Sequence, residues 1–120
     1  MIKAIVLDTE TTGLCLPQVV ELAYMSIDDD MLIKEDDVVC ERFQPRKLME
    51  ADASAVNGIF DMDLIGKPKT ENLLQVMPVV GEVQYIVGHN VEFDANAINL
   101  SINRTYDFKQ ICTKRLAMSA

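Results

Sequence analysis

Carboxylates follow two short apolar runs of this chain, directly in one case and seven residues later in the other. Asp8 and Glu10 come after the run Ile2–Leu7, which reads as a buried strand. Residues two apart on a strand point to the same face, so these two carboxylates are expected to lie side by side. Asp94 follows a second apolar run, Tyr85–Val87, and is expected at the entrance of a helix.

Three carboxylates that converge at strand ends form an oxygen-rich site. Such a site suits a hard divalent cation, either Mg²⁺ or Mn²⁺. Phosphodiester cleavage is the chemistry that these ions support best, because they activate water and stabilise the leaving oxygen. We therefore predict that Asp8, Glu10 and Asp94 are metal ligands and catalytic residues. The alternatives are a solvated strand end for Asp8 and Glu10 and helix capping for Asp94.

The residues around these carboxylates resemble the first two motifs of the DEDD (DnaQ-like) 3′→5′ exonuclease superfamily. The first motif, Asp-x-Glu-Thr-Thr-Gly followed by a hydrophobic residue, is matched from Asp8 to Leu14. The second motif, His-Asn-x-x-Phe-Asp, is matched from His89 to Asp94. Residues 112–117 are similar to the exonuclease X group of the DEDDh branch, where a Cys-Thr pair stands at this point.

This resemblance implies a ribonuclease H-like fold and metal-dependent release of 5′-mononucleotides from DNA 3′ ends. It implies a two-metal site in which Asp8 bridges both ions, Glu10 binds the water-activating ion and Asp94 binds the other. The residues that match family positions contacting or supporting the 3′-terminal nucleotide are Thr9, Thr11, Leu14, His89, Asn90 and Phe93. Single-stranded DNA is the expected partner. RNA is the alternative, because neither motif holds a residue that must read a 2′-hydroxyl.

Some of these assignments have simpler alternatives. Leu14 and Phe93 can belong to the core, and His89 can be a buried structural imidazole. Asn57, before Gly58, stands where family members often have His. For the whole chain the alternative is a non-catalytic module on the same fold, which binds nucleic acid or a protein.

The third family motif, a His followed five positions later by an Asp, has no match. The only histidine is His89, which belongs to the second motif, and the chain stops at Ala120, a few residues into an expected helix. We therefore expect residues 1–120 to be one incomplete exonuclease domain that lacks C-terminal helices. It should be weakly active or inactive, with one metal position compromised. Apolar surface left uncovered by the missing helices favours a homodimer.

The elements that position these residues follow from the apolar pattern, which predicts an α/β fold with a mixed five-stranded sheet flanked by helices. Strands are expected over residues 2–8, 19–27, 38–43, 84–88 and 109–112, the first three as an antiparallel meander with a turn at 28–30. Helices are expected over residues 71–80, capped by Thr70 and ended or kinked by Pro78, over 93–103, and from Thr113 onward. Short helical turns are expected within residues 46–66, ending near Gly58 and Gly66.

The composition indicates one globular domain. Of its 120 residues, 49% are hydrophobic and 25% are charged. No apolar run approaches the ~20 residues of a membrane span, and three cysteines without Cys-x-x-Cys spacing fit a reducing cytoplasm. The net charge is −8, although four of the 11 Lys and Arg residues follow Asp94. This acidity argues against broad duplex binding but not against contact with a few nucleotides at a strand end.

Overall fold

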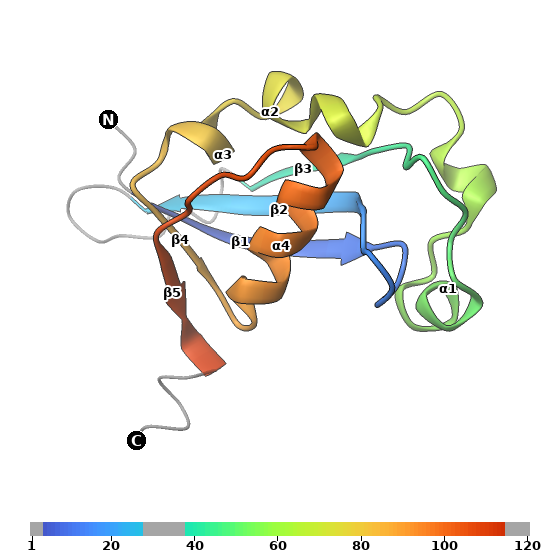
Figure 1. Ribbon diagram of the computed structural model, residues 1–120, viewed down its shortest axis with the longest axis horizontal. Coiled ribbons are helices and arrows are strands. Elements are labelled where there is room, and N and C mark those ends of the chain that lie inside the picture. Colours follow the sequence, from blue (N-terminus) through green and yellow to red (C-terminus); the bar gives the residue numbers. More distant parts are fainter. Residues whose placement is uncertain (1–3, 28–37, 115–120) are drawn as a thin grey trace.

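The protein is built on a mixed five-stranded sheet, seen in a computed structural model that describes residues 4–27 and 38–114 (Figure 1). The strands are β1 (Ala4–Thr11), β2 (Val19–Ile27), β3 (Val39–Arg42), β4 (Tyr85–Gly88) and β5 (Gln110–Cys112), in the spatial order β3-β2-β1-β4-β5. The first three strands pair antiparallel, and β4 pairs parallel with both β1 and β5. The predicted α/β sheet and its antiparallel meander are confirmed.

β1 lies at the centre of the sheet and is longer than the sequence predicted. Its ladder with β2 continues past Asp8 through Glu10, which pairs with Glu21, and ends at Thr11 after a register shift. We expected the strand to stop at Asp8 because the apolar run ends there. Backbone hydrogen bonds do not depend on side-chain polarity, and a strand end beside a cavity tolerates polar side chains. Both predicted carboxylates of the first motif therefore stand within β1.

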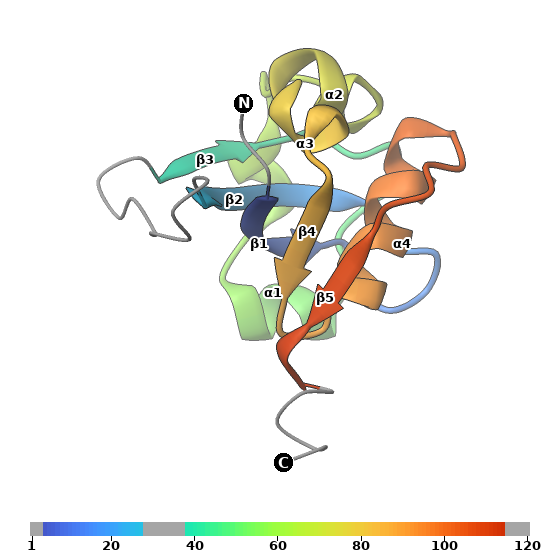
Figure 2. The same cartoon turned by 90° about the vertical axis from the view of Figure 1, so that its left-hand side faces the viewer.

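Helix α4 (Val91–Ile102) covers one face of the sheet (Figure 2). Val91, Ala95, Ile98 and Ile102 are buried at helical spacing and belong to the main core cluster. The helix begins two residues earlier than the expected 93–103 and ends before Asn103, which adopts the left-handed conformation with φ 60°. Burial of this apolar stripe against the strands fixes the position of the first helical turn, where the second motif lies.

The helix expected over residues 71–80 is divided into three short pieces. They are the 3₁₀ turn η3 (Thr70–Asn72) and the helices α2 (Leu73–Val76) and α3 (Val79–Glu82). The predicted break at Pro78 is confirmed, because proline cannot donate the hydrogen bond that a continuous helix needs. The predicted cap is wrong: the buried Thr70 hydroxyl donates 2.7 Å to the Val19 carbonyl instead.

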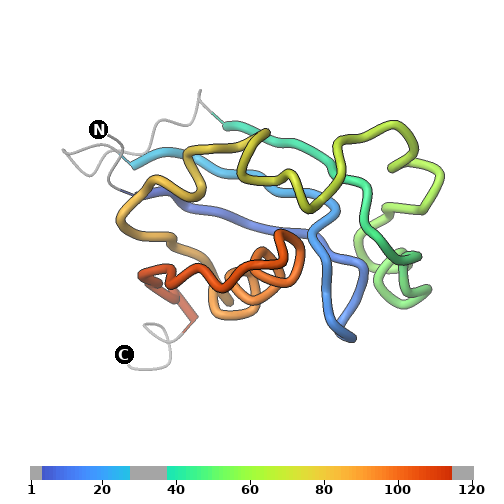
Figure 3. The backbone as a smooth tube through the Cα atoms, turned by 45° about the horizontal axis from the view of Figure 1, so that its top comes forward, coloured from blue at the N-terminus to red at the C-terminus, as the bar shows by residue number. Residues whose placement is uncertain are grey.

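Residues 44–70 form a separate layer beside the end of β1 (Figure 3). Helix α1 (Ala51–Asn57) and the 3₁₀ turn η2 (Asp61–Leu64) lie here, and a small cluster of Val20, Ile59 and Leu64 anchors them. Gly58 ends α1 with φ 72°, a left-handed conformation that suits glycine. The short helical turns expected in this stretch are therefore confirmed.

Parts of three predicted elements lie outside the described residues. They are residues 2 and 3 of the first strand, the turn at 28–30, and the third helix beyond Lys114, of which Thr113 and Lys114 are already helical. None of the helices in the described part of the chain has the length and apolar character needed to cross a membrane.

The start of β2 depends on a buried side chain of α4. Ser101 Oγ accepts a hydrogen bond of 2.8 Å from the Val19 N–H and donates one of 2.7 Å to the Ala97 carbonyl. Ser101→Ala should leave the buried Val19 N–H unpaired and lower the free energy of unfolding by about 1–3 kcal/mol. Urea titration followed by circular dichroism measures this, with the exposed Asn96→Ala on the same helix as control. A loss no larger than that of the control would contradict the assignment.

Candidate active site

A cavity of about 360 Å³ opens beside the C-terminal end of β1. Its walls come from β1, the following loop, the α1 region and α4, and the lining residues are Thr9, Glu10, Thr11, Gly13, Leu14, Glu50, Asp52, Ala53, Val56, Asn57 and Phe93. The structure thus brings motif residues that are far apart in the sequence to one hollow. A volume of this size is at the small end of ligand sites and suits one nucleotide better than a duplex.

Sequence reasoning missed the wall that α1 contributes. Ala53, Val56 and Asn57 line the cavity from this helix, at the i, i+3, i+4 spacing of one helical face. That spacing was visible in the sequence, but only short helical turns, and no cavity wall, were expected within residues 46–66. Val56 is 89% exposed and faces the same hollow as Leu14, which is 84% exposed. Two exposed apolar side chains therefore border a cavity that also carries the carboxylates of Glu10, Glu50 and Asp52.

Leu14 and Phe93 do not belong to the buried core, which was the alternative for both residues. The exposure of Leu14 rules out the core alternative, and it stands on the loop that follows β1. Phe93 is half-buried in the first turn of α4 and lines the cavity. The half-buried aromatic ring offers a flat face for stacking and the exposed leucine adds apolar surface, so both suit packing against a base.

Asp94 is held beneath β1 by a short hydrogen bond. Thr9 Oγ1 donates 2.5 Å to Asp94 Oδ1, and the Asp94 side chain is almost fully buried. Burial raises the pKa of Asp94 to about 6, and the negative charges of Asp8 and Glu10 act in the same direction, while the bond from Thr9 opposes them. The helix-capping alternative is not observed, since Asn90 occupies the N-cap position of α4.

Glu10 also has a raised pKa. Burial is the main cause, the charge of Asp8 adds to it, and a hydrogen bond from Asn57 opposes it. Asp8 itself is exposed. Because the charge of Asp8 raises the pKa of both other carboxylates, the three groups are near enough to repel one another. Mutual repulsion of this kind is what a bound cation relieves.

The predicted convergence of the three carboxylates is only partly formed. Within residues 4–27 and 38–114, no three Asp, Glu, His or Cys side chains lie close enough together to hold an ion. The reason is the alternation along β1, because Asp8 and Glu10 leave the strand on the face opposite to Thr9, toward which Asp94 points. The chemistry still fits a hard divalent cation, since the candidate ligands are all carboxylate oxygens.

His89 and Asn90 lie outside the cavity lining. His89 is exposed, so the alternative of a buried imidazole is wrong. Its Nδ1 lies 3.4 Å from Thr113 Oγ1, and its carbonyl accepts a hydrogen bond of 3.3 Å from Cys112 Sγ. Asn90 is exposed and makes no side-chain capping bond. Their predicted contacts with a nucleotide stay predictions.

Comparison with known proteins decides the family. Residues 5–115 match the profile of the exonuclease family known as RNase T. The chain belongs to this exonuclease family. It is thus a member of the DEDD superfamily, as the two motifs indicated, and the exonucleases of this family generally use divalent metal ions. A search of curated proteins found no match.

Two of the solved structures similar to this chain are DNA complexes. Exonuclease X in complex with 5′-overhanging duplex DNA has a TM-score of 0.76 and 25% identity, over 97% of this chain and 63% of that one. E. coli exonuclease I in complex with a dT13 oligonucleotide has a TM-score of 0.79 and 15% identity, over 99% of this chain and 29% of that one. The ribonuclease H-like fold is therefore confirmed. The chain spans less than two thirds of the length of either protein.

The raised pKa of Asp94 predicts how stability depends on pH without metal. In the folded state this carboxyl titrates near 6, above its ordinary value of 3.8, so the stabilisation present below pH 4 is lost as the pH rises through 6. Two pKa units correspond to about 3 kcal/mol. Asp94→Asn stays neutral and keeps an acceptor for Thr9, so its free energy of unfolding should exceed that of the wild type at pH 7.5 but not at pH 4.

Urea unfolding at both pH values in the presence of EDTA measures this difference. The exposed Asp107→Asn serves as the control for loss of one negative charge. If Asp94→Asn and the wild type show the same change in stability between the two pH values, the burial of an uncompensated carboxyl at position 94 is contradicted.

Proposed function

We propose that this domain hydrolyses DNA from the 3′ end in the 3′→5′ direction and releases 5′-mononucleotides. The observation that carries the proposal is the cavity lined by Thr9, Thr11, Leu14 and Phe93, in which the lining residue Thr9 is hydrogen-bonded to Asp94. It offers room for a terminal nucleotide beside carboxylates suited to divalent ions. The DNA complexes of exonuclease X and exonuclease I support DNA as the substrate.

In the proposed reaction Asp8, Glu10 and Asp94 hold the metal ions. When bound, the ions supply an activated water molecule and stabilise the leaving oxygen. Thr9 keeps one Asp94 oxygen engaged, so the other oxygen, Oδ2, is the one available to a ligand. Burial raises the pKa of Glu10, whereas Asn57 lowers it and so favours the charged form that binds a cation. Leu14 and Phe93 pack against the terminal base and hold the last phosphodiester bond near the carboxylates.

Among the residues that the structure describes, no histidine lines the cavity to act as the general base. The only histidine is His89, and it lies away from the cavity lining. We therefore propose that the 120-residue chain hydrolyses DNA slowly and that a chain which also carries the third motif is fully active.

The proposal has three further parts. Residues 1–120 form one incomplete exonuclease domain, the protein resides in the cytoplasm, and it self-associates. Sedimentation at micromolar concentration tests the self-association.

A non-catalytic module that binds strand ends is the second candidate. It is favoured by one observation, the absence of a tight cluster of three metal ligands among the described residues. The two candidates differ in their need for the carboxylates. Binding alone needs the cavity wall, whereas hydrolysis needs the cavity wall and the metal.

Metal binding tests the role of the carboxylates directly. Asp8→Ala should weaken the affinity for Mn²⁺ in calorimetric titration by more than about tenfold, because loss of a ligand costs more than loss of a supporting group. Glu41→Ala, an exposed carboxylate on β3, is the matched control and should bind as the wild type does. Equal Mn²⁺ binding by Asp8→Ala and the wild type would remove Asp8 from the site.

Direction and metal dependence are tested with end-labelled oligonucleotides. A 5′-labelled strand should shorten one nucleotide at a time, and a 3′-labelled strand should release labelled mononucleotide first. EDTA should stop both reactions, and DNA and RNA strands should be compared. The measurement uses the 120-residue chain and a longer chain that adds a third motif. Internal cuts at early times, or cleavage in EDTA, would exclude the proposed reaction, and binding without cleavage by the longer chain would favour the non-catalytic module.

A further inference from the structure

The loop that follows β1 carries Leu14 outward in a conformation that it does not favour by itself. Gly13 has φ 151° and Leu16 has φ 44°, both positive values that residues with side chains rarely adopt. Leu14 and Leu16 are exposed and contribute little burial to hold the loop. A hydrogen bond of 2.9 Å from Thr12 N to Gln18 O closes its base. The tip therefore needs contacts from another segment to keep one position.

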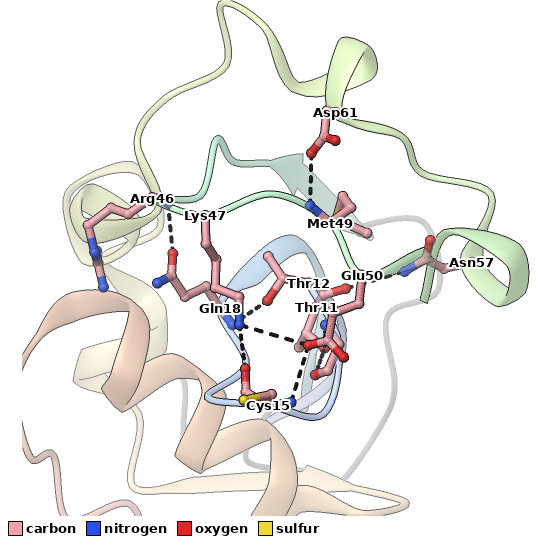
Figure 4. Close-up of polar contacts among 11 residues, drawn as sticks. Thr11, Thr12, Cys15, Gln18, Arg46, Lys47, Met49, Glu50, Asn57 and Asp61 are labelled. Atoms are coloured by element: carbon pink, nitrogen blue, oxygen red, sulfur yellow. Dashed lines mark hydrogen bonds and ion pairs between the residues drawn. The ribbon is translucent and has the colours of Figure 1, made fainter. Parts of the chain in front are cut away.

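Lys47 and Glu50 supply those contacts (Figure 4). The Cys15 N–H at the loop tip donates 3.2 Å to Glu50 Oε2, and Lys47 Nζ donates to the Cys15 carbonyl. Lys47 and Glu50 also form an ion pair of 3.8 Å. The Glu50 backbone N–H donates 2.8 Å to the Thr12 carbonyl. Both backbone polar groups of Cys15 are thus bound by two side chains that hold each other in place.

Gly13 is what lets the Glu50 carboxylate reach the loop. A Cβ atom at position 13 would lie 2.0 Å from Glu50 Cδ and 2.1 Å from Glu50 Oε2. Any larger residue would push the carboxylate away from the Cys15 N–H. The glycine of the first motif therefore has a local reason here that is separate from its φ angle.

Glu50 also stands directly before α1, which forms the opposite wall of the cavity. It is the N-cap residue of that helix and lines the cavity with Leu14 and Val56. A contact from Glu50 to the loop tip therefore fixes the distance between the two apolar borders of the cavity. The contact holds the loop and the helix as one unit.

We propose that Glu50, held by Lys47, is a positioning residue that places Leu14 at the mouth of the nucleotide cavity. This inference rests on the proposed function, in which the cavity takes the terminal nucleotide of a strand. Glu50 acts on binding through Leu14. Loss of Glu50 therefore lowers the affinity for the strand end without removing a metal ligand.

Fluorescence anisotropy tests the proposal by measuring the affinity for a short single strand in the presence of Mn²⁺. The strand carries fluorescein at its 5′ end and a phosphorothioate at its 3′-terminal linkage, which prevents cleavage. Glu50→Ala should weaken binding about fivefold to tenfold, as expected for loss of one ordinary, partly exposed hydrogen bond. Glu50→Gln keeps an oxygen that accepts from Cys15 N–H and should recover most of the affinity. Glu71→Ala is the matched control. It removes the ion pair of 3.5 Å between Glu71 and Arg46, which is similarly exposed and does not involve a residue of the cavity lining.

A double-mutant cycle separates positioning from a general structural effect. Leu14→Ala should weaken binding to a similar extent, and the variant with both substitutions should bind no more weakly than Leu14→Ala alone. Thermal unfolding shows that each variant is folded. Additive effects, or wild-type affinity of Glu50→Ala, would overturn the positioning role and leave the proposed function intact. If the wild type does not bind the strand end at all, the proposed function and this inference both fail.

Discussion

The parallel pairing of β1 with β4 is the interaction on which the candidate site depends. Val6 pairs with Val87 across 81 residues of sequence, and this register brings the start of α4 beside the second half of β1. Gly88 makes the approach possible, because a Cβ there would lie 3.2 Å from the Leu7 carbonyl and 3.3 Å from Asp94 Oδ2. With this pairing in place, the hydrogen bond from Thr9 to Asp94 needs no long side chain.

A second constraint is the bridge between the loop after β1 and the segment before α1. The sheet alone would leave the cavity open on one side, since the chain departs from β1 immediately after Thr11. Backbone and side-chain contacts between residues 12–18 and 46–50 close that side. The site is therefore assembled from three segments, each of which has a different reason to be where it is. Strand pairing places one, core burial of α4 places another, and polar contacts place the third.

The sequence was most informative where burial alone decides structure. The sequence pattern located the five strands of the described residues, and the buried stripe of α4 is readable at helical spacing. It was less informative where a polar residue is satisfied by a distant partner. Thr70 has the residue type of a helix cap, yet its hydroxyl binds Val19, a choice that depends on β2 lying next to it. The predicted end of β1 at Asp8 was wrong for the same reason, because pairing with β2 determines how far the strand extends.

The candidate site divides along the same line. The two motifs named the residues that line the cavity from β1, its following loop and α4, because local spacing in a strand or a helix fixes which side chains share a face. They also named His89 and Asn90, which lie outside the lining. They did not indicate the wall made by Val56 and Asn57. They also did not indicate that Asp94 faces Thr9 rather than Asp8 and Glu10, because that depends on the height at which α4 crosses the sheet.

The burial of Asp94 has a consequence for how the fold and a metal ion are related. A carboxyl whose pKa is raised to about 6 by burial opposes folding when it is ionised at neutral pH. A cation bound to it removes that opposition, so binding energy is returned to the native state in addition to serving catalysis. The proposed ion is then a folding ligand as well as a cofactor. Metal supply would set the resistance of this domain to proteolysis, and the population of open states around the first turn of α4 would fall as the ion binds.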